Sequence, residues 1–260
     1  MTTSLSPRNL RIEAAPSSTL GPIPFPRLVR VEWAKATDTR AARWLLALVA
    51  LSTAAMILAP ILAPTSFDQT YTSYLGVAAL ALSILLPVVA ILMFTGEWSQ
   101  RSAFSTFTQE PRRIRVVNAK LAVSMVLGGG AAVFGGAVTA AGLGLAAASG
   151  RALEANLTVG AITGYLLFVL LNVLAGVALG ALLQSSATAI AACFALPAAF
   201  AGLGTASTLV SDWIDMSTTW NWVLENDWAG HVPQISFSVL FWVAVPLAAG
   251  VVRTIRRDIT

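Results

Sequence analysis

Charged residues are scarce in this sequence. Asp, Glu, Lys and Arg make up 11% of its 260 residues, whereas 57% of the residues are hydrophobic. Ordinary soluble domains have roughly a quarter of their residues charged. The apolar residues form long runs of the kind that cross a bilayer, so the composition predicts a membrane protein. The length suits one bundle of about six helices.

Cysteine and histidine each occur only once. Because Cys193 is alone, no disulfide can form within the chain. His231 has no partners at the spacing of a metal site, so no metal is expected. A phosphate-binding loop needs Gly-Lys followed by Ser or Thr, and both lysines, Lys35 and Lys120, follow alanine instead. The sequence therefore predicts no enzyme and no cofactor in this chain; an ATPase would have to be a separate chain.

The middles of the apolar runs lack ionisable residues, and Asn172 is the most polar side chain there. Proton- or sodium-coupled carriers usually place such groups near the bilayer midplane, where they are costly and functional. An ion-coupled carrier is therefore disfavoured, as is acid–base or metal catalysis within the membrane. The net charge of +4 gathers beside the apolar runs and not in a patch interleaved with aromatics, which argues against nucleic-acid binding.

Six apolar runs are long enough to cross a hydrocarbon core about 30 Å thick. We expect spans near 44–62, 75–94, 121–148, 157–183, 187–210 and 235–252. Four of these runs contain a proline that should kink or end the helix, namely Pro60, Pro87, Pro197 and Pro246. The expected fold class is an all-α polytopic membrane protein with six transmembrane helices.

Basic residues predict the orientation. Seven precede the first run, five lie between the second and third, three follow the sixth, and only Arg151 falls on the other side. The positive-inside bias then places both termini and the 96–120 loop in the cytoplasm. The largest outer segment, 211–234, contains four tryptophans, which are expected at the outer membrane interface.

The N-terminal part divides into a tail and a helix. Residues 1–26 are rich in Pro, Ser and Thr and predict a flexible cytoplasmic tail. Over 27–43 we expect an interfacial helix with Leu28, Val29, Trp33 and Ala36 on one side. The alternative is a solvated helix that leads into the first span.

A polar interruption, 96–120, separates the second and third apolar runs. Within it Ala103, Phe104 and Phe107 share one face of a short amphipathic piece, which favours contact with a partner. The same loop contains Arg112, Arg113 and Arg115. For these arginines we retain two interpretations, contact with the partner and contact with anionic lipid.

Glycines four residues apart predict close helix packing on the fourth run. They form two pairs, Gly160 with Gly164 and Gly176 with Gly180. The triplet 128–130 lies inside an apolar run and no lysine follows it, so packing is favoured over phosphate binding there as well.

Two polar stretches carry a resemblance to a known family. The first is Arg30-Val31-Glu32-Trp33-Ala34-Lys35, with Thr39-Arg40 and Trp44 after it. The second is Gly96-Glu97-Trp98, followed by Pro111-Arg112-Arg113, Arg115-Val116 and Ala119-Lys120. With six spans and inner termini, the chain resembles the membrane subunit of type-2 ABC exporters, the ABC-2 permease family, in an actinobacterial-looking form. The resemblance covers about residues 27–257.

The resemblance implies a permease subunit of an ATP-binding cassette exporter in a bacterial cell membrane. Two copies of a separate cytoplasmic ABC ATPase would carry ATP and Mg, and a second permease chain would complete a homodimer or heterodimer. The resemblance implies ATPase coupling through Glu97, Arg101, Phe104, Phe107, Arg112, Arg113 and Arg115. It implies further contacts through Glu32, Lys35 and Arg40 on the interfacial helix. The substrate stays open, and the alternatives are an ion-coupled secondary carrier or a non-transporting scaffold or sensor subunit.

Overall fold

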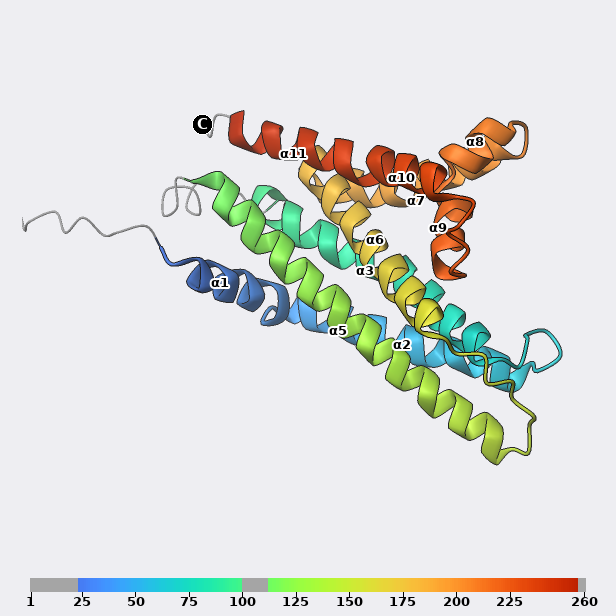
Figure 1. Cartoon of the computed structure of the whole chain (residues 1–260). Helices are drawn as coiled ribbons and strands as arrows, with labels where there is room; N and C mark the ends of the chain where they lie inside the picture. Colours follow the sequence, from blue (N-terminus) through green and yellow to red (C-terminus); the bar gives the residue numbers. More distant parts are fainter. Residues whose placement is uncertain (1–22, 100–111, 257–260) are drawn as a thin grey trace, which may run out of the picture.

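The computed structural model describes residues 23–99 and 112–256, and these residues fold as helices joined by short connections (Figure 1). In chain order the helices are α1 (Phe25–Thr37), α2 (Arg40–Leu62), α3 (Tyr71–Ser99), α5 (Arg113–Ala148), α6 (Val159–Leu183), α7 (Ser186–Gly204), α8 (Thr208–Trp213), α9 (Met216–Leu224), α10 (Val232–Val239) and α11 (Val245–Arg256). A π-helical turn, Leu240–Ala244, joins α10 to α11.

Six of these segments are long and apolar enough to cross a membrane. They are α2, α3, α5, α6, α7 and the continuous segment from α10 to α11. The expected all-α fold with six candidate spans is therefore confirmed, and the chain has the make-up of a multi-pass membrane protein. The predicted tail 1–26 lies almost wholly outside the described residues.

Helices α3 and α6 form the centre of the bundle. They pack along each other, with α2 and α5 against α3 and with α7 and α11 against α6. About 61% of the apolar stretch of each central helix is buried, compared with 22% for α2 and 6% for α7. Since lipid solvates apolar side chains, α2 and α7 can remain this exposed within a bilayer.

Two glycines allow α3 and α6 to approach closely. A Cβ atom on Gly176 would lie 2.5 Å from the carbonyl oxygen of Pro87, and one on Gly180 would lie 3.1 Å from the Cβ of Phe94. Any larger residue at Gly176 would therefore separate the two backbones. This is the close packing that small residues permit between helices in lipid.

Several helix boundaries differ from those expected. The single helix expected over 27–43 is interrupted at 38–39, because the hydroxyl of Thr39 caps α2 by accepting a hydrogen bond from the Ala42 N–H at 3.1 Å. The run expected at 121–148 already begins at Arg113, and α5 has 36 residues, or about 54 Å. It therefore extends beyond a hydrocarbon core of about 30 Å. The run expected at 187–210 ends at Gly204, where α7 ends.

The prolines lie within continuing helices. Pro60, Pro87 and Pro197 are inside α2, α3 and α7. Pro246 follows the π-helical turn, in which the N–H of Val245 bonds back to the carbonyl of Leu240. The wider turn accommodates a proline that cannot donate its own backbone hydrogen bond.

The first described helix begins and the last one ends at the same end of the bundle, on the left of Figure 1. We call this the terminal end. At the opposite end Arg151 donates hydrogen bonds to the carbonyls of Pro60, at 3.0 Å, and Ile61. Because the last carbonyls of a helix lack partners within it, Arg151 caps the C-terminal end of α2.

Candidate functional site

Four charged side chains meet at the terminal end, and we call them the charge cluster: Glu32, Lys35, Glu97 and Lys120. Lys35 Nζ lies 2.7 Å from Glu32 Oε1 and 2.7 Å from Glu97 Oε1. Lys120 Nζ lies 2.7 Å from Glu32 Oε2 and 3.5 Å from Glu97 Oε1. The cluster thus joins α1 to the last turn of α3 and the first turns of α5.

Three members of the cluster are buried. Glu32, Glu97 and Lys120 expose 5%, 6% and 5% of their surface, whereas the side chain of Lys35 is 42% exposed. Lys120 also donates a hydrogen bond to the carbonyl of Met93 at 3.1 Å. Buried charges are tolerated only when they are paired, and here two carboxylates face two ammonium groups. Removal of one member leaves a buried net charge.

The two glutamates also affect the ionisation of Lys35. Burial by itself would lower the pKa of this ammonium group, but the carboxylates of Glu97 and Glu32 outweigh burial. The pKa of Lys35 is therefore raised above its ordinary value of 10.5. Lys35 is positively charged throughout the physiological pH range.

The one acidic residue of α1, Glu32, faces the bundle. The buried residues of α1 are Leu28, Glu32 and Ala36, which recur every four positions and face α5. Leu28, Trp33 and Ala36 were expected on one apolar side of this helix. Leu28 and Ala36 are buried, but Trp33 is 40% exposed. The ion pair with Lys120 explains the difference, because only this orientation brings the Glu32 carboxylate to its buried partner.

The terminal end is held together by further polar contacts to α11. Arg113 donates to the carbonyls of Thr254 and Ile255 at 2.8 and 3.2 Å. Arg253 donates to the carbonyl of Leu182 at 2.7 Å. A cation beside the last carbonyls of a helix is favourable because it complements the helix dipole.

The structure unites some of the predicted coupling residues and separates others. Glu97 meets Glu32 and Lys35 in the charge cluster, but Arg40 lies exposed in the first turn of α2. Arg112 is exposed at the start of α5, and Arg115 donates a hydrogen bond to the carbonyl of Ile23. Arg101, Phe104 and Phe107 lie outside the described residues.

Lys120 is the member of the cluster to which sequence reasoning gave no role. In the sequence it ends the second polar stretch, and it follows alanine and so does not fit a phosphate-binding loop. One signal was available: the chain has two lysines, and each lies in one of the two polar stretches. A second signal pointed to the cluster as a whole: Glu32 and Lys35 stand three residues apart, a spacing at which side chains on a helix can pair.

The other predicted glycine pair packs at the opposite end of the bundle. A Cβ atom on Gly160 would collide with the side chain of Asn226, and one on Gly164 would collide with the carbonyl oxygen of Val223. Both contacts are with the segment 211–234, so α9 and the turn after it lie against α6. This packing also encloses Trp220, which is 0% exposed, although it was expected at the membrane interface with its neighbours.

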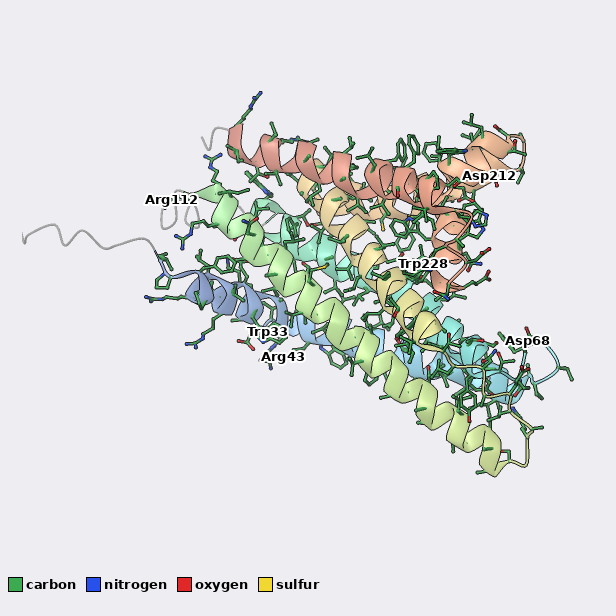
Figure 2. All side chains as sticks on the ribbon, in the orientation of Figure 1. Trp33, Arg43, Asp68, Arg112, Asp212 and Trp228 are labelled. Atoms are coloured by element: carbon green, nitrogen blue, oxygen red, sulfur yellow. The ribbon has the colours of Figure 1, made fainter. Side chains whose placement is uncertain are left out.

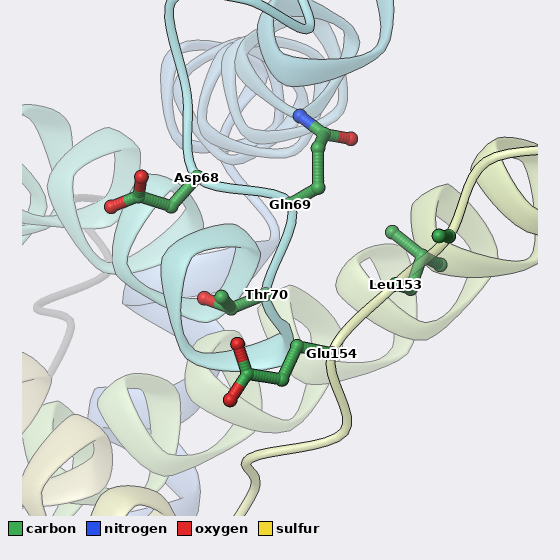
Figure 3. A pocket seen from close by; sticks show the side chains of 6 residues that line it. Asp68, Gln69, Thr70, Leu153 and Glu154 are labelled. Atoms are coloured by element: carbon green, nitrogen blue, oxygen red, sulfur yellow. The ribbon is translucent and has the colours of Figure 1, made fainter.

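A shallow pocket lies at the same opposite end, with a volume of about 570 Å³. It is lined by Asp68, Gln69, Thr70, Ala152, Leu153 and Glu154. In Figure 3 the Asp68, Thr70 and Glu154 side chains point to one side and Gln69 points away. Among the described residues no three His, Cys, Asp or Glu side chains are grouped as metal ligands would be. The pocket therefore offers no recognisable chemistry, and the charge cluster is the better candidate site.

The charge cluster connects α1, α3 and α5 at one end of the bundle. It joins the two polar stretches on which the family resemblance rests. No protein-family model matches the chain, and neither does any curated protein or solved structure with which it was compared.

Proposed function

We propose that the chain is the membrane subunit of an ATP-binding cassette exporter. It would form the substrate path and be driven by a separate cytoplasmic ATPase that binds ATP and Mg. The observation that carries the proposal is the charge cluster. Residues 32 and 35, from the first polar stretch, pair with residues 97 and 120, from the second. The two stretches of the resemblance thus belong to one unit.

The cluster suggests how force would enter the bundle. An ATPase that closes on ATP would push on the loop between α3 and α5, which includes the proposed coupling residues Phe104 and Phe107. Buried ion pairs resist separation, because each charge would be left desolvated and unpaired. A push on this loop would therefore move α1 and the adjoining ends of α3 and α5 together, and rock the spans between access states.

Orientation and assembly form part of the same proposal. Fifteen of the sixteen basic residues fall on the side of the termini and the 96–120 loop, which supports a cytoplasmic terminal end in a bacterial cell membrane. Helix α7 buries only 6% of its apolar stretch within the chain. This exposed face leaves room for a second permease chain, identical or related.

Site-specific photo-crosslinking tests the proposed coupling loop. A photoreactive phenylalanine analogue at position 104 or 107 should crosslink the partner ATPase in the intact membrane. The same analogue at Phe134, 40% exposed in the middle of α5, is the matched control and should give no ATPase adduct. If positions 104 and 107 give no ATPase adduct in a correctly inserted chain, the coupling role is wrong.

A further inference from the structure

Four arginines lie along α1 and in the first turn of α2, and we call them the basic corner: Arg27, Arg30, Arg40 and Arg43. All four are exposed. Among the described residues, the side chains of Arg27, Arg30 and Arg40 form neither a hydrogen bond nor an ion pair. Arg43 lies 4.0 Å from Asp38, the one acidic residue at this corner. Three guanidinium groups are thus available to an anionic partner.

Large apolar side chains accompany these arginines. Phe25, Val31 and Trp33 on α1 are 41%, 45% and 40% exposed, and Trp44 on α2 is 77% exposed. Figure 2 labels Trp33 on α1 and Arg43 on α2. Exposed aromatic and aliphatic residues beside arginines are typical of a surface that enters the headgroup region of a bilayer.

The length of α2 gives the depth of the basic corner. The helix has 23 residues, or about 35 Å, whereas the hydrocarbon core is about 30 Å thick. About one turn must therefore lie among the headgroups. The first turn, from Arg40 to Arg43, is the charged one, whereas the other end of α2 is apolar at Leu62. If α2 stands upright, the guanidinium groups of Arg40 and Arg43 lie at the depth of lipid phosphates.

The charge cluster holds α1 against the bundle. Glu32 on the buried face of α1 is paired with Lys120 of α5, so α1 is held against a helix that itself crosses the membrane. Arg27 and Arg30 lie away from the buried face and near the start of α1. The corner is therefore held in place before any lipid binds.

We propose that the basic corner binds the headgroups of anionic phospholipids in the adjoining leaflet. Four positive charges face one negative charge there, so the surface complements a phosphodiester with net negative charge. Phospholipid fits better than a protein partner, because Trp44 and Trp33 need an apolar medium beside the phosphates. This inference does not depend on transport or on an ATPase.

Native mass spectrometry of the full-length chain tests the proposal. The chain is released from micelles that contain phosphatidylglycerol and phosphatidylcholine in equal amounts, and the bound lipids are counted over a concentration series. The wild-type chain should retain phosphatidylglycerol preferentially. Arg30→Gln should weaken its apparent affinity about fivefold, since each basic residue near an anionic surface contributes a factor of that order. Arg27→Gln/Arg30→Gln/Arg40→Gln should abolish the preference.

Two control variants separate specific binding from a general loss of charge or of fold. Arg256→Gln removes an exposed arginine from the same end of the bundle but outside the basic corner, and should leave the preference unchanged. The variant Arg27→Lys/Arg30→Lys/Arg40→Lys keeps the positive charges and should retain most of the preference for phosphatidylglycerol. The proposal is overturned if the glutamine triple variant still prefers phosphatidylglycerol. It is equally overturned if Arg256→Gln weakens binding as much as Arg30→Gln, or if the corner instead crosslinks a protein in native membranes.

Discussion

Lys120 is the residue on which the charge cluster depends most, because water reaches Lys35 but not Lys120. The side chain of Lys120 is 6% exposed and contacts both glutamates, and that of Lys35 is 42% exposed. A buried pair that loses one partner is costly, whereas a half-exposed pair contributes little. The two lysines of this chain therefore form a natural matched comparison.

We predict that Lys120→Met destabilises the chain by about 3–5 kcal/mol, because it leaves a buried negative charge uncompensated. Lys35→Met should cost less than Lys120→Met, because water reaches position 35 and can solvate the glutamate charge that remains there. Glu32→Gln/Lys120→Met restores neutrality and should regain much of the loss. Unfolding in mixed micelles with increasing dodecyl sulfate measures all three. Equal losses for the two single lysine variants would contradict this account of the cluster.

The pH dependence of Lys35 provides a second test. Its pKa is raised in the folded chain, so its contribution is fully present below the ordinary pKa of 10.5 and is lost as pH rises through the higher folded value. The difference in thermal midpoint between wild type and Lys35→Met should stay constant from pH 7 to about pH 9 and shrink in more alkaline buffer. A difference that grows with alkaline pH would contradict the direction of the shift.

At the scale of elements, glycines set the distance between helices. Gly176 lies directly against the backbone of Pro87, whereas nothing lies within 4 Å of the place where a Cβ on Gly130 would be. The two glycines are both inside long apolar helices, but only one is at an interface within the chain. Substitution should therefore have opposite consequences at the two positions.

We expect Gly176→Ala to destabilise the chain by about 1–3 kcal/mol, the usual cost of overpacking. Gly130→Ala should leave stability unchanged or slightly higher, because alanine favours the helix. Thermal unfolding of both variants in the same detergent is the measurement. Comparable losses at both positions would mean that α5 has a close partner at Gly130 in the assembled protein.

Much of this element structure was predictable from the sequence, and the reasons for the failures are physical. Long apolar runs locate the spans because a bilayer imposes a minimum length. The inward orientation of Glu32 was not predictable, since periodicity assigns a charged residue to the polar face and Lys120 is far away in sequence. The break at Thr39 was not predicted, because the residues around it favour a helix and the sequence does not show that Thr39 caps the start of α2. The burial of Trp220 depends on α9 packing on the glycine face of α6.

For the whole molecule, orientation is the next property to test. Basic residues predict that the terminal end is cytoplasmic and that the exposed Ala155, between α5 and α6, faces outward. In a chain whose single cysteine is replaced by Cys193→Ser, a membrane-impermeant maleimide should label Ala155→Cys in intact cells. It should label Thr260→Cys only after the cells are opened. The reverse pattern would contradict the proposed orientation and place the loop between α3 and α5 away from any cytoplasmic ATPase.

At the largest scale, we propose that this chain works with a separate ATPase. Purification of the tagged chain from its own host in mild detergent, followed by mass spectrometry of what remains bound, tests that claim most directly. We predict a stoichiometric P-loop ATPase in the wild-type sample, and a reduced amount with Lys120→Met, because this variant loosens α1 from α5. An intact chain that reproducibly lacks any ATPase would contradict the claim and favour the secondary carrier or the scaffold.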